Sequence, residues 1–119
     1  MEIPKIFDSE YRFCLILWEY EPINSTRLAT LCKEKLGWSK ATTYTVIRRL
    51  AERGVLKNEN AMVTSLITKE QVQSSELEQF VEKTFEGSFP AFLAVFANSK
   101  KLSNEEVSQL QKMIDNYKG

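Results

Sequence analysis

The side chains of this sequence that are best suited to recognising a ligand lie close together, within residues 39–49. They combine short hydroxyl groups with cationic groups and are Ser39, Lys40, Thr42, Tyr44, Thr45, Arg48 and Arg49. Hydroxyl side chains can reach base edges in the major groove of DNA, and cations one helical turn further along can contact phosphates. The segment therefore predicts non-covalent recognition of double-stranded DNA.

The members of this set have different expected roles. Thr42 and Thr45 are the expected base contacts, and Tyr44 is expected to contact a base or a phosphate. The alternative for Tyr44 is a partly buried ring that closes the domain. The cations are expected to hold phosphates, as are the backbone amides at the start of the segment. For the arginines the alternative is surface pairing, since Arg48 and Glu52 are i, i+4 neighbours.

A helix must position these side chains. On its other face, an i, i+3, i+4, i+7 pattern predicts a buried stripe that consists of Thr43, Val46, Ile47 and Leu50. Ser39 is a suitable N-cap for this helix, and Gly54 is a suitable stop. The pattern predicts a recognition helix with one buried face and one face directed at DNA.

Two helices are predicted before it. The first, over about 8–20, can be capped by Asp8 and is apolar nearly all round, which indicates burial on several sides. The second, over about 25–36, is capped by Asn24 or Ser25 and ends at Gly37. Because only two or three residues separate it from the recognition helix, these two helices form a predicted helix-turn-helix.

A small β hairpin is predicted behind the recognition helix. Runs rich in β-forming residues cover 55–57 and 62–67, and residues 58–61 are suited to the turn between them. A hairpin in this place is a wing. Its tip offers Glu59 and, beyond Lys57, no cation, which argues against contact between the wing and the DNA backbone.

Three further helices are predicted in the second half. Capping boxes that begin at Thr68 and Ser103 start helices to about residues 86 and 117, and an almost wholly apolar helix covers 89–97 between them. A bundle of about 50 residues cannot easily bury five phenylalanines, so self-association is expected to cover them. The expected dimerisation residues are Phe80, Phe85, Phe89, Phe92, Phe96, Leu110 and Ile114. The alternative is packing of the aromatic side chains against the first half of the same chain.

Composition limits the function. The 119 residues contain 16 Lys and Arg, 16 Asp and Glu, and no His, so the net charge is zero. The charge is uneven, because residues 27–57 hold eight basic and two acidic side chains, and a local charge of +6 favours contact with phosphates. The sequence has no Gly-rich phosphate loop, nucleophile motif or metal-ligand cluster, so no enzyme activity, cofactor or metal is expected.

The two cysteines, Cys14 and Cys32, lie far apart among apolar residues, which favours buried thiols over a disulfide or a zinc site. The alternative is a thiol sensor, which requires one of them to be exposed and reactive. No apolar run approaches the roughly 20 residues of a membrane span, and the first residues carry no signal-peptide pattern. We expect a cytoplasmic protein without membrane contact.

Several segments together carry a resemblance through their order and spacing. They are Phe-Asp-Ser-Glu-Tyr at 7–11, Ile-Leu-Trp-Glu at 16–19, Gly-Trp-Ser at 37–39 and on to Leu50, Gly-Val-Leu at 54–56, Phe-Glu-Gly-Ser-Phe at 85–89, and Leu-Ser-Asn-Glu-Glu-Val-Ser-Gln-Leu at 102–110. Through them nearly the whole chain resembles the penicillinase-repressor family of transcriptional regulators (the BlaI/MecI/CopY group). The resemblance implies a winged-helix DNA-binding domain and a three-helix dimerisation domain. It also implies a homodimer that binds an inverted-repeat operator and represses nearby genes, usually for β-lactam resistance or copper handling.

Three features depart from the family pattern. Members that are cleaved during antibiotic induction carry an Asn-Phe pair where this sequence has Val95-Phe96, so relief of repression by that cleavage is not carried over. Copper-responsive members carry a C-terminal cysteine cluster, whereas residues 115–119 contain no cysteine, so copper sensing by that route is not expected. The wing is also shorter than usual and lacks the family's basic and aromatic residues. The inducing signal and any upstream sensor are left open.

The predicted fold class is mainly α with a small β wing. Residues 1–67 are expected to form a winged helix-turn-helix DNA-binding domain, and residues 68–119 a three-helix dimerisation domain. The predicted function is that of a homodimeric transcriptional repressor on an inverted-repeat operator. The alternative is a winged-helix dimeric adaptor for proteins, without specific DNA binding, which the zero net charge and the acidic wing tip favour.

Overall fold

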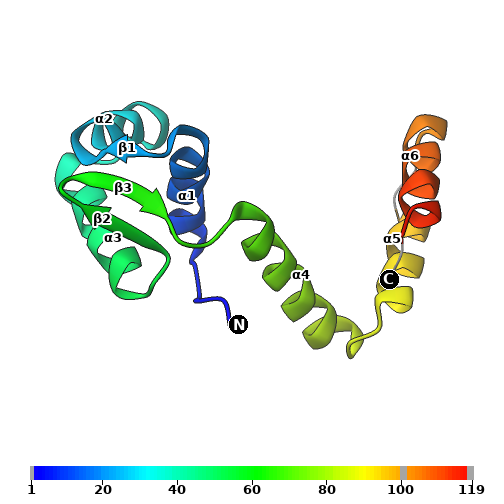
Figure 1. Cartoon of the computed structure of the whole chain (residues 1–119). Helices are drawn as coiled ribbons and strands as arrows, with labels where there is room; N and C mark the ends of the chain where they lie inside the picture. Colours follow the sequence, from blue (N-terminus) through cyan, green and yellow to red (C-terminus); the bar gives the residue numbers. More distant parts are fainter. Residues whose placement is uncertain (1, 100–101, 118–119) are drawn as a thin grey trace. The chain divides into compact units, whose positions relative to one another are not determined.

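Figure 1 shows the computed structural model of the chain, which describes residues 2–99 and 102–117. The elements are, in order, α1 (Asp8–Tyr20), β1 (Ile23–Asn24), α2 (Ser25–Leu36), α3 (Lys40–Glu52), β2 (Leu56–Glu59), β3 (Met62–Ser65), α4 (Lys69–Phe85), α5 (Phe89–Ser99) and α6 (Asn104–Asp115). They form two compact units, Met1–Glu76 and Leu77–Gly119. The fold is mainly α with a small antiparallel sheet, and the first unit is a winged helix, as predicted.

The helix-turn-helix has the predicted bounds because its caps are local. The Asn24 side chain accepts the N–H of Thr26 at 2.8 Å and so starts α2. Gly37 ends α2 in the left-handed conformation, with φ at 71°, where a side chain would be strained. The Ser39 hydroxyl then accepts the N–H of Thr42 at 3.1 Å and starts α3. Two helices are thereby joined by a connection of three residues.

The start of α1 differs from the prediction. Phe7 and not Asp8 occupies the N-cap position, and its own side chain makes no capping hydrogen bond. Glu10 makes only the reciprocal contact of a capping box, in which its carboxylate accepts the N–H of Phe7 at 2.9 Å. Asp8 is instead the first helical residue, where a negative charge interacts favourably with the helix dipole.

The wing is a three-stranded antiparallel sheet with the strand order β1-β3-β2. Glu59 pairs with Met62, so the turn between β2 and β3 contains two residues and is shorter than the predicted 58–61. These two residues, Asn60 and Ala61, both have positive φ, as a type I′ turn requires. The short strand β1, which pairs Ile23 with Val63, was not predicted.

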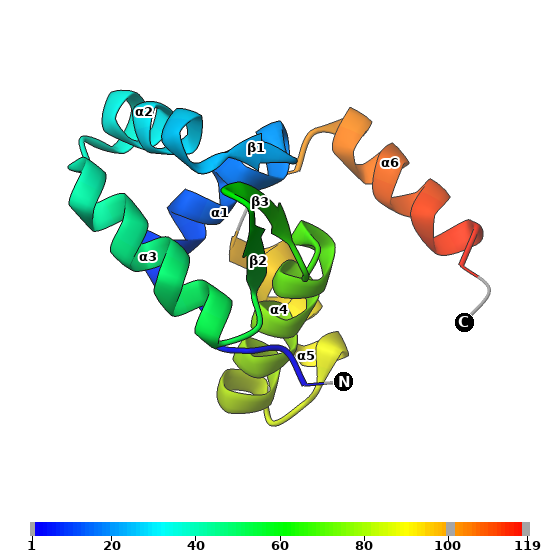
Figure 2. The same ribbon diagram turned by 60° about the vertical axis from the view of Figure 1, so that its left-hand side comes forward.

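The core of the first unit lies between the three helices and the sheet (Figure 2). Its largest fully buried side chains include Phe13 and Leu17 of α1, Leu28 of α2 and Leu50 of α3. The start of α4 joins this core through Val72. The predicted stripe of α3 is confirmed, since all four of its side chains are buried. Removal of this apolar surface from water holds α3 in place and fixes which face it exposes.

The second unit contains an aromatic cluster. Neighbouring ring centroids lie 5.7–6.2 Å apart among Phe80, Phe85, Phe92 and Phe96.

Both predicted capping boxes are present, with hydrogen bonds of 2.8–3.1 Å at Thr68 and Ser103. Large apolar side chains remain exposed on the helices of this unit: Leu77, Phe80, Phe89, Leu93, Val95, Val107, Leu110, Met113 and Ile114.

Candidate nucleic-acid interface

The predicted ligand-contacting face of α3 is largely open to solvent. Its exposed side chains are Lys40, Thr42, Arg48 and Arg49, while those of Tyr44 and Thr45 are half-buried. The opposite face is buried in the core, so the helix cannot turn without exposing its apolar stripe to water. The sequence-predicted residues are thus brought together on one fixed surface.

The first turn of α3 divides its polar groups between capping and recognition. Ser39 acts on the helix itself, since its hydroxyl accepts the N–H of Thr42 and donates to the Thr42 Oγ1 at 2.9 Å. The proton of the Thr42 hydroxyl is then left to donate outward, to a base acceptor or a phosphate oxygen. The N–H groups of Lys40 and Ala41 have no acceptor within the helix, and such amides at a helix N-terminus attract anions.

Tyr44 packs its ring against the hydrophobic core of the first unit. The ammonium of Lys40 lies 5.8 Å from the centroid of this ring, within the range of a cation–π contact. The packing matches the alternative of a ring that closes the domain, and contact between Tyr44 and DNA stays a prediction. The same packing limits where the Lys40 charge can move.

The basic side chains near α3 differ in whether a carboxylate neutralises them. Within the part of the chain that the structure describes, Arg48 forms no ion pair with Glu52, so the pairing alternative is absent from this conformation. Arg53 is different, because its guanidinium pairs with the buried carboxylate of Glu10. The positive charge on α3 that no carboxylate neutralises in the described chain therefore belongs to Lys40, Arg48 and Arg49, and not to Arg53.

A hollow of about 420 Å³ lies where α2 meets the start of α3. Its lining combines two ammonium groups with three hydroxyls and is formed by Thr26, Ala29, Thr30, Lys33, Ser39 and Lys40. The two ammonium groups and the Thr26 hydroxyl are donors that suit a phosphate group, whereas the Thr30 hydroxyl donates to the Thr26 carbonyl and the Ser39 hydroxyl to Thr42. Our sequence reasoning missed Thr26, Thr30 and Lys33, although their i, i+4, i+7 spacing on a capped helix indicates a shared face.

The wing contributes few groups that attract an anion. Its tip is exposed and carries Glu59, and the ammonium of Lys57 lies 3.8 Å from that carboxylate. Both side chains are mainly in solvent, so this pair contributes little to stability. The charge of Lys57 is nevertheless partly balanced at the point where the wing would approach a phosphate.

The two cysteines are buried, as predicted. Burial, together with the nearby Glu10 carboxylate, raises the pKa of the Cys14 thiol to about 12. Burial also raises the pKa of Cys32. A raised thiol pKa lowers the fraction of reactive thiolate, which disfavours a sensor at either residue. Among residues 2–99 and 102–117, no group of three or more His, Cys, Asp or Glu is placed to hold a metal ion.

A comparison with known protein families decides the relationship that these features indicate. The family model described as penicillinase repressor matches residues 6–116. The chain belongs to this family. Because the family consists of repressors, the expectation that the protein is not an enzyme is confirmed. In the described parts of the chain, no helix has the length and apolar character needed to cross a membrane.

Individual members of the penicillinase-repressor family match almost the full chain. The penicillinase repressor of Bacillus licheniformis is 23% identical over 121 residues, covering 98% of this chain and 94% of the relative. The methicillin resistance regulatory protein MecI of Staphylococcus aureus (strain Mu50) is 23% identical over 115 residues, covering 93% and 94%. A solution structure of monomeric Bacillus licheniformis BlaI with the blaP half-operator matches with a TM-score of 0.52 and 26% identity, covering 59% of this chain and 90% of that chain.

Proposed function

We propose that this protein is a transcriptional repressor that binds operator DNA through the exposed face of α3. The observation that carries the proposal is the set of hydroxyl and cationic groups on that face, held in place by the buried stripe behind it. The structure of BlaI in complex with the blaP half-operator supports it, because this chain shares the family and the winged-helix fold. A repressor of this kind acts in the cytoplasm, where bacterial DNA lies.

Recognition divides between two kinds of contact. Thr42 and Thr45 lie between Lys40 and Arg48 along α3 and read base edges in the major groove. The cations Lys40, Arg48 and Arg49 hold phosphates on either side, and Tyr44 adds a base or phosphate contact. A further phosphate enters the hollow beside Lys33, next to the free amides at the start of α3.

The second unit makes the protein a homodimer. Seven apolar side chains form the proposed interface: Phe80, Phe85, Phe89, Phe92, Phe96, Leu110 and Ile114. Four of them are exposed in the single chain, and Ile114 is 66% exposed. A symmetric dimer presents two α3 helices to successive major grooves, roughly 34–36 Å apart, and so reads an inverted repeat. Occupancy of a promoter then blocks transcription without any bond being made or broken.

A binding titration tests the proposal. Fluorescence anisotropy would compare the duplex upstream of the protein's own gene with a scrambled duplex at several salt concentrations. We expect saturation at two chains per site, preference for the upstream duplex, and an affinity that falls steeply with salt because counterions are released. Equal affinity for the two duplexes at every salt concentration would contradict sequence-specific repression.

One observation favours a second function, that of a dimeric adaptor which binds another protein. The tip of the wing carries Glu59 and faces solvent, so a basic partner could dock where DNA could not. The same titration separates the two functions. An intact dimer that binds neither duplex would support the adaptor.

A further inference from the structure

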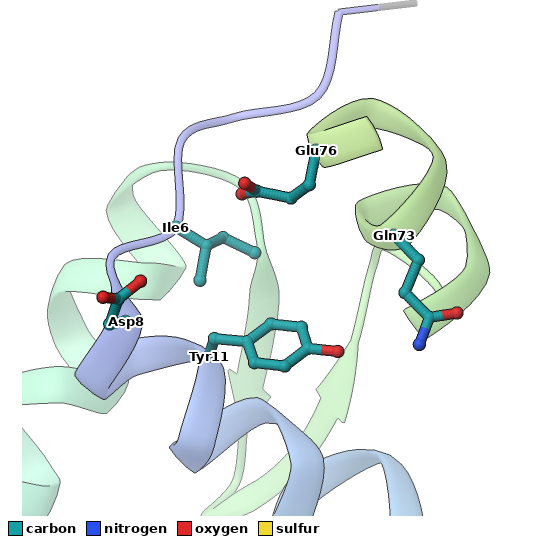
Figure 3. A pocket seen from close by; sticks show the side chains of 5 residues that line it. All are labelled: Ile6, Asp8, Tyr11, Gln73 and Glu76. Atoms are coloured by element: carbon teal, nitrogen blue, oxygen red, sulfur yellow. The ribbon is translucent and has the colours of Figure 1, made fainter. Parts of the chain in front are cut away.

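A hollow of about 300 Å³ lies on the first unit between the N-terminal arm (residues 2–7), α1 and the start of α4 (Figure 3). It is lined by Ile6, Asp8, Tyr11, Gln73 and Glu76. Figure 3 shows Ile6 and Glu76 pointing into it from facing sides, while the Tyr11 ring lies across its lower side. The volume is at the lower end of the range for pockets that hold small molecules.

The lining combines two apolar side chains, Ile6 and Tyr11, with the carboxylates of Asp8 and Glu76. Ile6 belongs to the buried core, and the Tyr11 ring packs edge-on to Trp18, with 5.8 Å between centroids. The carboxylate of Asp8 is compensated by the N-terminus of α1. Glu76 lies two turns inside α4 and, in the part of the chain described, forms no ion pair. Its charge therefore attracts a cation into a pocket that also has room for an apolar group.

The side chains that line the pocket offer too few ligands for a metal ion. The pocket has two carboxylates on different elements, and the described residues contain no group of three or more acidic, His or Cys ligands that could hold a metal. Divalent cations in proteins require more oxygen ligands than this. An organic cation needs only one carboxylate and an apolar surface, which the pocket provides through Glu76, Ile6 and Tyr11.

The arm that forms one wall is tied to the recognition helix. Phe7, between two lining residues, donates its N–H to Glu10, and Glu10 pairs with Arg53 at the C-terminal end of α3. Arg53 also donates to the carbonyl of Lys5 at 2.7 Å. The opposite wall belongs to α4, which continues into the second unit. A ligand in the pocket therefore contacts both the N-terminal arm, which is bonded to the end of α3, and α4, which leads to the proposed dimerisation helices.

We propose that this pocket is an effector site for a small organic cation, a primary amine or guanidinium on a short apolar body, and that its occupancy changes the affinity for DNA. The effect on DNA rests on the proposed function, whereas binding of the cation does not. Such coupling requires the cation to have different affinities for the free and the DNA-bound protein. The factor by which the cation changes the affinity for DNA then equals the factor by which DNA changes the affinity for the cation.

Binding of the cation is tested on the full chain by NMR with phenethylamine as the probe and 2-phenylethanol as its neutral counterpart. We expect saturable shifts confined to Ile6, Tyr11 and Gln73, and weaker binding of the alcohol. Glu76→Gln should weaken phenethylamine binding about fivefold, as loss of one partly exposed charge pair implies. Glu78→Gln removes the same charge from an exposed site on α4 outside the pocket and should change nothing. Equal effects of the two variants, unsaturable shifts, or the same shifts with Mg²⁺ would overturn the site.

The coupling is tested by repeating the operator titration with saturating phenethylamine. We expect an altered affinity in the wild type and in Glu78→Gln, and a reduced alteration in Glu76→Gln at the same concentration. Saturable binding with no change in DNA affinity would overturn the effector role. If the wild type binds no DNA at all, the proposed function fails, while the NMR result still decides whether the pocket binds a cation.

Discussion

At the scale of single residues, the polar side chains of α3 and its N-cap fall into two groups. Some make hydrogen bonds that stabilise the helix, and the others remain available to bind a ligand. Ser39 spends both hydrogen-bonding roles of its hydroxyl on Thr42. The Thr43 hydroxyl donates to the Ser39 carbonyl at 3.3 Å, inside the domain. In the described chain, the side chains of Thr45 and Arg49 make no such hydrogen bond to the helix. Substitutions there should therefore change DNA binding with little effect on folding.

Thr45→Ala and Arg49→Ala should affect DNA binding in different ways. Loss of a base contact at Thr45 should weaken binding to the operator by about 1 kcal/mol per half-site and leave random DNA unaffected. Loss of the Arg49 cation should weaken binding to all duplexes alike. It should also reduce the slope of log K against log salt by about 0.9 per phosphate contact.

Anisotropy titrations over a series of salt concentrations measure both effects. Arg12→Ala is the matched control, because it removes a guanidinium from the exposed surface of α1. If Thr45→Ala weakens operator and random DNA equally, Thr45 is not a reader of sequence. A salt slope that Arg49→Ala leaves unchanged would remove Arg49 from the phosphate contacts.

The thiol of Cys14 should be unreactive in the folded protein. Because burial raises its pKa from 9.0 to about 12, the thiolate is scarce at neutral pH, and a thiol reagent also cannot reach it. The sign of the pH effect follows: the unfolded chain loses this proton first, so the contribution of Cys14 to stability is complete below pH 9.0 and is lost between pH 9.0 and about 12.

A chromogenic disulfide reagent would measure this at neutral pH, with the protein native and in guanidinium chloride. Two thiols should react after unfolding and almost none before it. Rapid reaction of one thiol in the native protein would restore the thiol-sensor alternative.

At the scale of secondary structure, the elements that the sequence predicts well are those whose signals are local. The caps at Asn24 and Ser39 and the two capping boxes act within three residues, so they can be recognised without knowledge of the fold. Strand β1 has two residues and owes its existence to a partner some forty positions away. No periodicity can arise in so short a segment, and this explains why it was missed.

For the candidate site too, the sequence predicted the features that depend on local spacing and missed those that depend on contacts between elements. The recognition set on α3 follows from helical spacing, whereas the hollow at Lys33 depends on how closely α2 approaches α3. The Glu10–Arg53 pair joins residues from the first and third helices, so counting charges along the sequence placed Arg53 in the basic patch by mistake. Contacts between elements are therefore what sequence reasoning lacked.

The wing turn leads to a prediction about stability. Ala61 has φ at 65°, in the left-handed region where a Cβ atom is unfavourable, and the type I′ turn prefers glycine after asparagine. Ala61→Gly should therefore raise the free energy of unfolding by about 0.5–1 kcal/mol, the strain relieved being partly offset by greater freedom of the unfolded chain. Urea denaturation would measure the change. A loss of stability of that size would show that the turn does not hold this conformation.

At the scale of the whole molecule, the two units differ in the function proposed for each. The first unit has its own core and caps, and it carries every group proposed to contact DNA. The second unit leaves a series of large apolar side chains in solvent. Exposed apolar surface of this extent marks an interaction site in a soluble protein. We therefore expect that loss of the dimer would leave the affinity for a half-site intact and abolish the advantage of two linked half-sites.

Ile114→Asp tests this separation. A carboxylate at this position of the proposed dimer interface would be left without a partner, and its desolvation would cost several kcal/mol, enough to dissociate a dimer. Light scattering should then give a mass of 13.8 kDa, that of one chain, in place of twice this value. Binding to a single half-site should be unchanged, while binding to the full inverted repeat should fall to the half-site level.

The matched control for this variant is Ser108→Asp, which adds the same carboxylate to an exposed polar position of α6. It should remain a dimer and bind the full repeat as the wild type does. Circular dichroism would establish that both variants keep their helices. If Ile114→Asp stays dimeric with its helices intact, the interface does not include Ile114. If it becomes monomeric and still binds the full repeat as tightly as before, dimerisation has no part in operator recognition.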